Sequence, residues 1–224
     1  MKVTWLTESG LLFDTGKIKI MVDPYLSDSA DGGRKRKIAP SESFLSLTPD
    51  VLLITHSHPC HLDEKTLEKI LGGRAVTVLA PETSYERLLS FGGAHNLVLI
   101  SPHTVWSEGG VTFYAVHAEH SDRCAVGYII DDGKKSYYVS GDTLYNYDVI
   151  DDVLDLVPDG VDFAFLPING RDNNMNATDA ADLAYEIGAK CAVPVHYGLF
   201  DDVNPESFDF DDALIIKPYE ETTL

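Results

Sequence analysis

The sequence is short of cysteine, of basic residues and of long apolar segments, and each shortage excludes a class of protein. Its three cysteines, Cys60, Cys124 and Cys191, are too few and too widely spaced for a disulfide framework. No apolar segment approaches the roughly 20 residues that a helix needs to cross a bilayer. The first ten residues lack the basic and apolar stretches of a secretory signal. We therefore expect a cytoplasmic protein without a membrane anchor.

Basic residues are also outnumbered, because 17 lysines and arginines stand against 36 aspartates and glutamates, for a formal net charge of −19. Such a surface repels phosphate backbones and anionic lipids at long range. We expect neither nucleic acid nor a membrane as partner, and a small molecule as substrate. Four basic residues are consecutive at 34–37. We interpret this segment as a solvated loop or, alternatively, as an anion-attracting rim beside the active site.

The pattern of apolar residues predicts an α/β fold in which strands and helices alternate. Residues 25–49 are expected to be irregular, the Asp132-Gly133 pair predicts a hairpin, and Asn176 predicts a helix N-cap. No linker or repeat divides the chain, so we expect a single domain over 1–224 with sheets inside and helices outside. The expected strands are 2–6, 11–13, 17–22, 51–55, 75–80, 97–101, 111–117, 125–131, 135–141, 161–168 and 191–196, and the expected helices are 64–71, 83–91, 148–156 and 177–187.

Side chains that bind metals stand where the expected strands end. In α/β proteins, chemically active residues gather just beyond the carboxyl ends of strands. His56 and His58, two apart in an extended chain, project to the same side, which suits two ligands of one ion. His61 lies in the following turn and can point toward a second ion, while Asp63 is the expected N-cap of the next helix. The other residues at strand ends are His117, His120, Asp142 and His196.

Five stretches resemble, in order, the metallo-β-lactamase fold hydrolases: VDPYLS (22–27), HSHPCH (56–61), His120, SGDT (140–143) and PVH (194–196). This resemblance implies a four-layer αββα sandwich of mixed sheets inside and helices outside. Within the family, the sequence is closer to the L-ascorbate-6-phosphate lactonase group, through SGDTLYNYDVID, LPINGRDNNMNATDA and VPVHYGLFDDVNPE. One stretch departs from the family, since Thr7 and Glu8 stand where it has Gly-His. We expect Glu8 to be solvated.

The resemblance implies a division of labour among the polar residues. His56, His58 and His120 would hold a first ion, His61 and His196 a second, and Asp142 would bridge both. Asp142 and His61 are also the predicted catalytic residues. The carboxylate of Asp23 would support the metal-binding histidines. His117 competes with His120 for the third-histidine role. We favour His120 because AVHAEHS then fits the family pattern, which leaves His117 at the edge of the pocket or behind the ligands.

Cys60 occupies the position at which the family has an aspartate. A thiolate coordinates zinc at about 2.3 Å and favours softer ions than manganese. Cys60 therefore either replaces the carboxylate as a ligand, which we favour, or leaves a weak or empty second metal position. We expect one or two divalent ions, with Zn²⁺ preferred and Mn²⁺ as the alternative.

These residues predict a metal-dependent hydrolase. Metal binding lowers the pKa of water to about 7, so a metal-bound hydroxide would be the nucleophile. The expected substrate is a small, anionic ester, lactone or phosphodiester, and Asn169 and Arg171 are the candidate substrate-binding residues, because a guanidinium binds anions bidentately. The alternative is a non-catalytic or weakly active metal-binding or sensing module with an altered second metal site.

Overall fold

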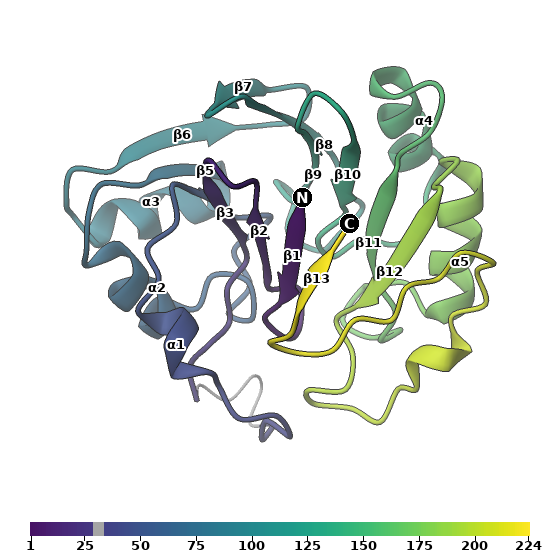
Figure 1. Ribbon diagram of the computed structural model, residues 1–224, viewed down its shortest axis with the longest axis horizontal. Coiled ribbons are helices and arrows are strands. Elements are labelled where there is room, and N and C mark those ends of the chain that lie inside the picture. The colour runs from purple at the N-terminus through teal and green to yellow at the C-terminus, as the bar shows by residue number, and fades with distance from the viewer. Residues whose placement is uncertain (29–33) are drawn as a thin grey trace. The chain divides into compact units, whose positions relative to one another are not determined.

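The computed structural model describes residues 1–28 and 34–224, which form two compact units (Figure 1). The first unit comprises Met1–Ile100 with Ile216–Leu224, and the second comprises Ser101–Ile215. Each unit contains one mixed β-sheet and its helices. Residues 29–33, part of the segment expected to be irregular, lie outside the described residues. A short helix, α1 (Glu42–Leu45), forms in the remainder of that segment, where no element was expected.

The sheet of the first unit has seven strands in the order β13-β1-β2-β3-β4-β5-β6. Strands β3 to β6 are parallel, and the other pairs are antiparallel. Since parallel strands end at the same edge of a sheet, the residues that follow β3 and β4 come together there. The strands are β1 (Lys2–Trp5), β2 (Leu11–Asp14), β3 (Lys19–Val22), β4 (Val51–Leu53), β5 (Thr77–Pro81), β6 (Asn96–Ile100) and β13 (Glu221–Thr223).

Two amphipathic helices cover one face of this sheet, α2 (Glu64–Leu71) and α3 (Glu82–Ser90). Apolar residues at helical spacing in α2, Leu67, Ile70 and Leu71, pack with Leu88 of α3 in one buried cluster. Alternate residues of the strands complete the cluster from the sheet side, for example Leu52 of β4. The burial of this cluster fixes the position of α2 and therefore of the loop between β4 and α2.

The sheet of the second unit has six strands in the order β12-β11-β10-β9-β8-β7. Strands β10, β11 and β12 are parallel, and the others are antiparallel. Helix α4 (Tyr147–Leu156) packs on β8, and α5 (Ala177–Glu186) packs on β11 and β12. The strands are β7 (Val105–Glu108), β8 (Val111–His117), β9 (Val126–Asp131), β10 (Ser136–Val139), β11 (Phe163–Pro167) and β12 (Cys191–Val195), and a 3₁₀ helix, η1, spans Pro205–Ser207.

Local sequence signals predicted most elements, and among the exceptions β13 depends on a distant partner, β1. The Asp132-Gly133 hairpin is confirmed, because β9 and β10 pair antiparallel around Gly133 with φ of 81°. Asn176 is confirmed as the N-cap of α5, since its Oδ1 accepts from the backbone N–H groups of Thr178 at 2.9 Å and Asp179 at 3.0 Å. The elements without a prediction are α1, β7, η1 and β13.

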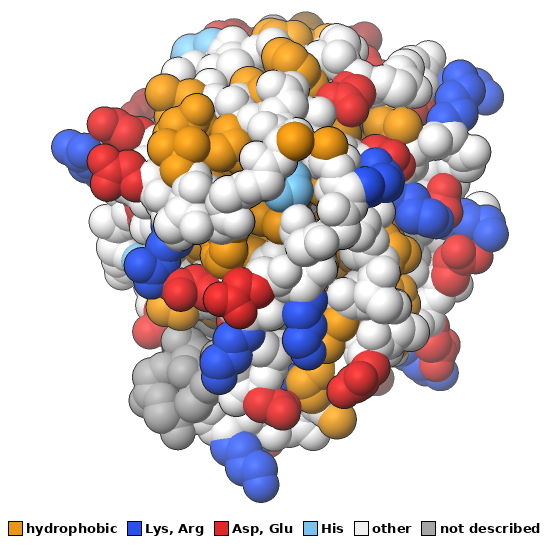
Figure 2. All heavy atoms as spheres, turned by 90° about the vertical axis from the view of Figure 1, so that its left-hand side faces the viewer, with side chains coloured by type: hydrophobic (Ala, Val, Ile, Leu, Met, Phe, Trp, Pro, Cys, Tyr) orange, Lys and Arg blue, Asp and Glu red, His pale blue; other side chains and the backbone are white. Residues whose placement is uncertain are grey.

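The two longest helices, α4 and α5, have ten residues each. No helix of the described residues has the length and apolarity that crossing a bilayer requires. On the face of the molecule in Figure 2, lysine and arginine side chains lie beside aspartate and glutamate side chains. Ion pairs such as Arg74 with Asp50, at 2.6 Å, show the same alternation of sign.

Two glycines with nearly equal φ allow the cost of a left-handed backbone to be measured separately from the cost of crowding by neighbouring atoms. Gly133 has φ of 81° and open space around its Cα, whereas a Cβ on Gly160, with φ of 83°, would lie 2.1 Å from the carbonyl oxygen of Gly188. We expect Gly133→Ala to lower the free energy of unfolding by about 1–2 kcal/mol, the cost of a left-handed residue. Gly160→Ala carries an additional overpacking cost of about 1–3 kcal/mol. Urea denaturation measures both, and equal losses would contradict the close approach.

Candidate metal centre

The loop after β4 gathers, within the first unit, four side chains of types that can bind a metal ion. A ring nitrogen of His56 lies within 4.8 Å of a ring nitrogen of His58 and of one of His61. The Sγ atom of Cys60 lies within 4.8 Å of a ring nitrogen of His61. The turn that achieves this closes through the backbone N–H of His61, which donates to the carbonyl of His58 at 2.9 Å. His56 and His61 are fully buried, and Cys60 is 8% exposed.

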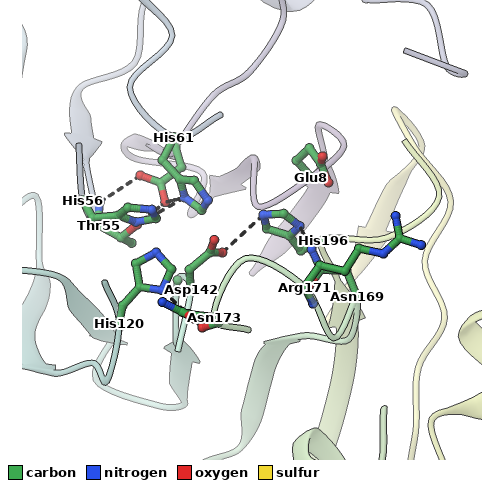
Figure 3. A network of polar contacts seen from close by, with 12 residues as sticks. Glu8, Thr55, His56, His61, His120, Asp142, Asn169, Arg171, Asn173 and His196 are labelled. Carbon is green, nitrogen blue, oxygen red and sulfur yellow. Dashed lines mark hydrogen bonds and ion pairs between the residues drawn. The ribbon is translucent and has the colours of Figure 1, made fainter. Parts of the chain in front are cut away.

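Asp23 and Thr55 fix the orientation of two of these histidines, His56 and His61, which Figure 3 shows with Thr55. The Oδ2 atom of Asp23 lies 2.7 Å from Nδ1 of His61, and its Oδ1 accepts from the backbone N–H of Thr55 at 2.8 Å. The hydroxyl of Thr55 donates to the same carboxylate and lies 3.0 Å from Nδ1 of His56. With Nδ1 of both rings engaged, Nε2 is the nitrogen that each ring presents to an ion. Thr55 was not predicted as a site residue, and its position directly before His-x-His was the only available signal.

Asp63 secures the other end of this loop, but not as the sequence predicted. It lies at the N-cap position of α2, yet its side chain makes no capping hydrogen bond with the helix backbone. Its carboxylate instead accepts from the backbone N–H of Ser27 at 3.2 Å, from the Ser27 hydroxyl at 3.0 Å and from the Thr66 hydroxyl. Three donors from side chains and a distant segment therefore occupy the carboxylate. Asp63 ties the chain after β3 to the start of α2.

The second unit brings Asp142 and His196 together at the carboxyl ends of β10 and β12. The Oδ1 atom of Asp142 lies 3.3 Å from Nε2 of His196, and both residues are buried (Figure 3). On the other side of the imidazole, the side-chain amide nitrogen of Asn169 lies 3.0 Å from Nδ1 of His196. Burial raises the pKa of the neighbouring Tyr197 to about 12.

The contacts of the two competing histidines favour His120 as a ligand. Nδ1 of His120 lies 3.2 Å from the backbone carbonyl of Asn173, which leaves Nε2 as the nitrogen that could bind an ion. Nε2 of His117 lies 3.6 Å from the carboxylate of Glu119. The backbone N–H of Glu119 donates to the Thr143 hydroxyl at 2.9 Å, which holds the segment of His120 beside that of Asp142.

The two predicted substrate-binding residues occupy different environments. Asn169 is 8% exposed and contacts His196, so the structure places it behind a candidate ligand rather than on an open surface. Arg171 is exposed, and its side chain extends away from Asp142 in Figure 3. Among the described residues, its guanidinium takes part in no ion pair. Arg171 therefore offers a solvent-accessible positive charge two residues from Asn169.

One expectation about the first unit was wrong. Glu8 is not solvated, because it is only 3% exposed in a turn where it and Thr7 have φ of 46° and 76°. The Nε1 of Trp5 donates to the Glu8 carbonyl at 2.7 Å, which keeps this turn against the sheet.

In the segment 34–37, Lys35 and Lys37 are exposed, as expected of a solvated loop, whereas Arg36 is half-buried and does not form an anion-attracting rim. Its guanidinium lies 4.9 Å from the ring centroid of Tyr25, a cation–π distance. The same group donates to neighbouring oxygens, namely the carbonyls of Tyr25, Ser27 and Ile38 and the hydroxyls of Thr7 and Tyr219. These bonds occupy the planar fork that would otherwise bind an anion, so Arg36 braces the chain after β3.

Comparison with known proteins places the chain in a family. Residues 19–197 match the family model of the β-lactamase superfamily domain, and the chain belongs to that superfamily. A UPF0173 metal-dependent hydrolase of Thermoplasma acidophilum is 32% identical over 202 residues, covering 86% of this chain and 83% of the relative. The chain is thus a member of a family of metal-dependent hydrolases.

Solved structures confirm the expected fold class. The metallo-β-lactamase fold protein YhfI of Bacillus subtilis is similar with a TM-score of 0.74 at 19% identity, over 99% of this chain and 98% of that one. Igni18, a metallo hydrolase of the archaeon Ignicoccus hospitalis, gives a TM-score of 0.75 at 21% identity, over 99% and 97% of the two chains. The α/β fold of metallo-β-lactamase type follows from these likenesses and from the two mixed sheets.

We expect Asp23→Ala to destabilise the metal-free protein, because it removes the acceptor of the Thr55 N–H, the Thr55 hydroxyl and His61. Each buried donor left without a partner costs about 1–3 kcal/mol, so we expect a loss of about 3 kcal/mol or more. Asp23→Asn is the matched control, since asparagine tolerates the φ of 40° and keeps one oxygen. Urea denaturation in chelator measures both. A loss below about 0.5 kcal/mol for Asp23→Ala, the size of an ordinary surface substitution, would contradict the role of Asp23.

Proposed function

We propose that the protein is a hydrolase that uses one or two divalent ions. The observation that carries the proposal is how two fully buried imidazoles are held: Nδ1 of His56 and Nδ1 of His61 each engage a fixed neighbour, which leaves Nε2 as the nitrogen that can bind an ion. The superfamily match spans every candidate ligand, because all of them fall within residues 19–197. The proposed ligands are His56, His58, Cys60, His61, His120, Asp142 and His196.

The donor chemistry of these residues fits a divalent transition metal. Imidazole, thiolate and carboxylate are the ligands of zinc in proteins, and a carboxylate can bridge two ions. When bound, such ions polarise the bond to be broken and lower the pKa of water toward neutrality, which supplies a nucleophile. Zn²⁺ is the preferred ion because of Cys60, and Mn²⁺ is the alternative.

The residues of the chain prepare the site for this chemistry. The carboxylate of Asp23 accepts the Nδ1 proton of His61 and so selects the tautomer whose Nε2 binds an ion. Thr55 orients His56 in the same way. Asp142 can hold a proton at Oδ1, the atom that lies 3.3 Å from Nε2 of His196. We assign catalytic roles to Asp142 and His61, and supporting roles to Asp23 and Thr55.

The proposed substrate is a small anionic ester, lactone or phosphodiester. Arg171 supports the anionic class, because it is an exposed guanidinium without an ion pair among the described residues, on the loop whose Asn169 contacts His196. A guanidinium binds carboxylate and phosphate groups bidentately. The resemblance to the L-ascorbate-6-phosphate lactonase group, carried by residues 140–151, 166–180 and 193–206, points to the same class.

Metal analysis and a substrate panel test this function together. We expect at least one zinc or manganese ion per chain by elemental analysis, and turnover of an anionic lactone, ester or phosphodiester. A chelator should abolish the turnover, and Zn²⁺ or Mn²⁺ should restore it. Failure to bind either ion would overturn the proposal. Tight metal binding without turnover of any substrate would favour the sensing module instead.

The Arg171→Ala variant, measured with the same substrate panel, tests whether Arg171 binds an anionic group of the substrate. A charge-assisted hydrogen bond contributes about 1.5–3 kcal/mol, so we expect KM to rise about tenfold or more for anionic substrates and to stay unchanged for their neutral analogues. Arg74→Ala is the control, since Arg74 is exposed but paired with Asp50. An equal rise in KM for charged and neutral substrates would remove Arg171 from anion binding.

Cys60 favours a second candidate function, a metal-binding or sensing module of low activity. Its Sγ atom is buried beside His61, at the position where the resemblance expects a carboxylate. A carboxylate there would supply both a ligand for harder ions and a group for proton transfer to the leaving group. Its replacement by sulfur favours zinc binding over turnover.

We expect Cys60→Ser to weaken zinc binding tenfold or more in competition titrations, because a hydroxyl replaces a thiolate ligand. The cobalt-substituted wild-type protein should show a thiolate-to-metal charge-transfer band that the Cys60→Ser protein lacks. Cys60→Asp should shift the preference toward Mn²⁺ and raise turnover. Cys124→Ser is the control. Unchanged zinc affinity and no charge-transfer band would show that Cys60 is not a ligand.

A further inference from the structure

One loop of the second unit, residues 169–176, contacts the surroundings of every metal-ligand candidate in that unit. The side chain of Asn169 lies 3.0 Å from Nδ1 of His196, and the carbonyl of Asn173 lies 3.2 Å from Nδ1 of His120. The backbone N–H of Met175 donates to the carbonyl of Thr143, the residue after Asp142, at 3.0 Å. Three candidate ligands from three different strand ends therefore depend on the same eight-residue segment.

The loop is held in a conformation that costs free energy. Asp172 and Asn173 are in the left-handed region, with φ of 55° and 63°. The side chain of Asn174 is only 4% exposed, and neither of its amide atoms has a hydrogen-bond partner. Two backbone hydrogen bonds close the loop, from Gly170 to Met175 and from Asn174 to Arg171, both at 3.0 Å. Strain and unsatisfied buried groups of this kind concentrate where function requires a fixed geometry.

The Asn169 amide has two hydrogen bonds that constrain the tautomer of His196. Its Oδ1 accepts from the backbone N–H of Arg171 at 3.4 Å, and its Nδ2 faces Nδ1 of His196. An amide N–H donates only to an unprotonated Nδ1, which leaves the proton of the neutral ring on Nε2. In that tautomer Nε2 faces Asp142 as a donor and cannot bind an ion. Metal binding through Nε2 requires Nδ1–H and an acceptor beside it.

We infer that Asn169 is a positioning residue. When an ion binds at His196, the side-chain amide of Asn169 rotates so that its oxygen and nitrogen exchange places, and Oδ1 of Asn169 then accepts the Nδ1 proton of His196. In the same loop, the Asn173 carbonyl accepts the Nδ1 proton of His120 and needs no rearrangement. The inference rests on the proposed metal site. The loop then has a role distinct from substrate binding, because it determines which ring nitrogen of His120 and of His196 carries the proton. When an ion binds, the backbone N–H of Arg171 loses its weak contact with Oδ1 of Asn169.

Replacement of Asn169 by an obligate acceptor and by a non-polar isostere tests this inference. Partners of metal-ligating histidines contribute about 10–100-fold to metal affinity. We expect Asn169→Leu to weaken zinc affinity by about that factor in competition titrations, and Asn169→Asp to bind zinc at least as tightly as wild type. A residue with a merely structural role would be impaired by both changes. Zinc affinity unchanged in Asn169→Leu, or lowered equally in both variants, would overturn the inference.

Two further measurements keep the result independent of folding and of the proposed function. Nitrogen-15 NMR of His196 should show Nδ1 protonated in the zinc-loaded protein and Nε2 protonated in the metal-free protein. A protonated Nδ1 in both forms would contradict the rotation of the Asn169 amide. Thermal unfolding of each metal-free variant serves as the folding control. If the wild-type protein binds no zinc, the proposed function fails, whereas equal binding by wild type and Asn169→Leu defeats only this inference.

Two substitutions that differ in their effect on the backbone conformation of residue 173 test the role of the Asn173 carbonyl. Glycine accepts the φ of 63° freely, whereas a β-branched valine resists it and pulls the carbonyl from His120. We expect Asn173→Gly to bind zinc as wild type does and Asn173→Val to bind it about 10–100-fold more weakly. Equal affinities for the two variants would overturn the role of this carbonyl.

Discussion

The carboxylate of Asp23 and its contact with His61 are the interaction on which the candidate metal centre of the first unit depends. A fully buried carboxylate is costly unless donors surround it, and here three donors do so: the Thr55 N–H, the Thr55 hydroxyl and His61. The same bonds decide which nitrogen of His61 carries a proton. A group that satisfies its own burial thereby fixes the ligand geometry, so stability and metal binding depend on the same atoms.

A second constraint is the way in which the chain leaves the parallel strands. Directly after β3 and β12 stand Asp23 and His196, with φ of 40° and 56°, and Gly141, with φ of 60°, precedes Asp142 after β10. A left-handed residue turns the chain sharply at the end of a strand, so the polar side chain lies at the sheet edge instead of continuing along the strand. Aspartate is among the few residues that tolerate this conformation well, which accounts for its use in the V-D-P stretch.

The sequence was informative wherever a property is local. Alternation and turn residues predicted the strands and the Asn176 cap, and the spacing of His56, His58 and His61 predicted that their rings would cluster. Properties set by distant segments were not accessible. Strand β13 pairs with β1 across more than 200 residues, with Lys2 opposite Thr223. The burial of Glu8, the bracing by Arg36 and the contact of Asn169 with His196 likewise depend on partners that no local pattern encodes.

The charge of the proposed ligand set resolves an apparent conflict with the acidity of the protein. A formal net charge of −19 repels an anionic substrate at long range, and this repulsion is screened beyond a Debye length of about 8 Å at physiological salt. Close to the ligands, the positive charge of bound ions outweighs the negative charge of the side chains. When two divalent ions are bound, the proposed ligands set against them five neutral imidazoles and only two anionic groups, Asp142 and the Cys60 thiolate. The carboxylate of Asp23, which is hydrogen-bonded to His61, adds a further negative charge, and Arg171 adds a positive one. With ions bound, the proposed site therefore attracts an anion at short range, within a molecule whose net charge repels anions from a distance.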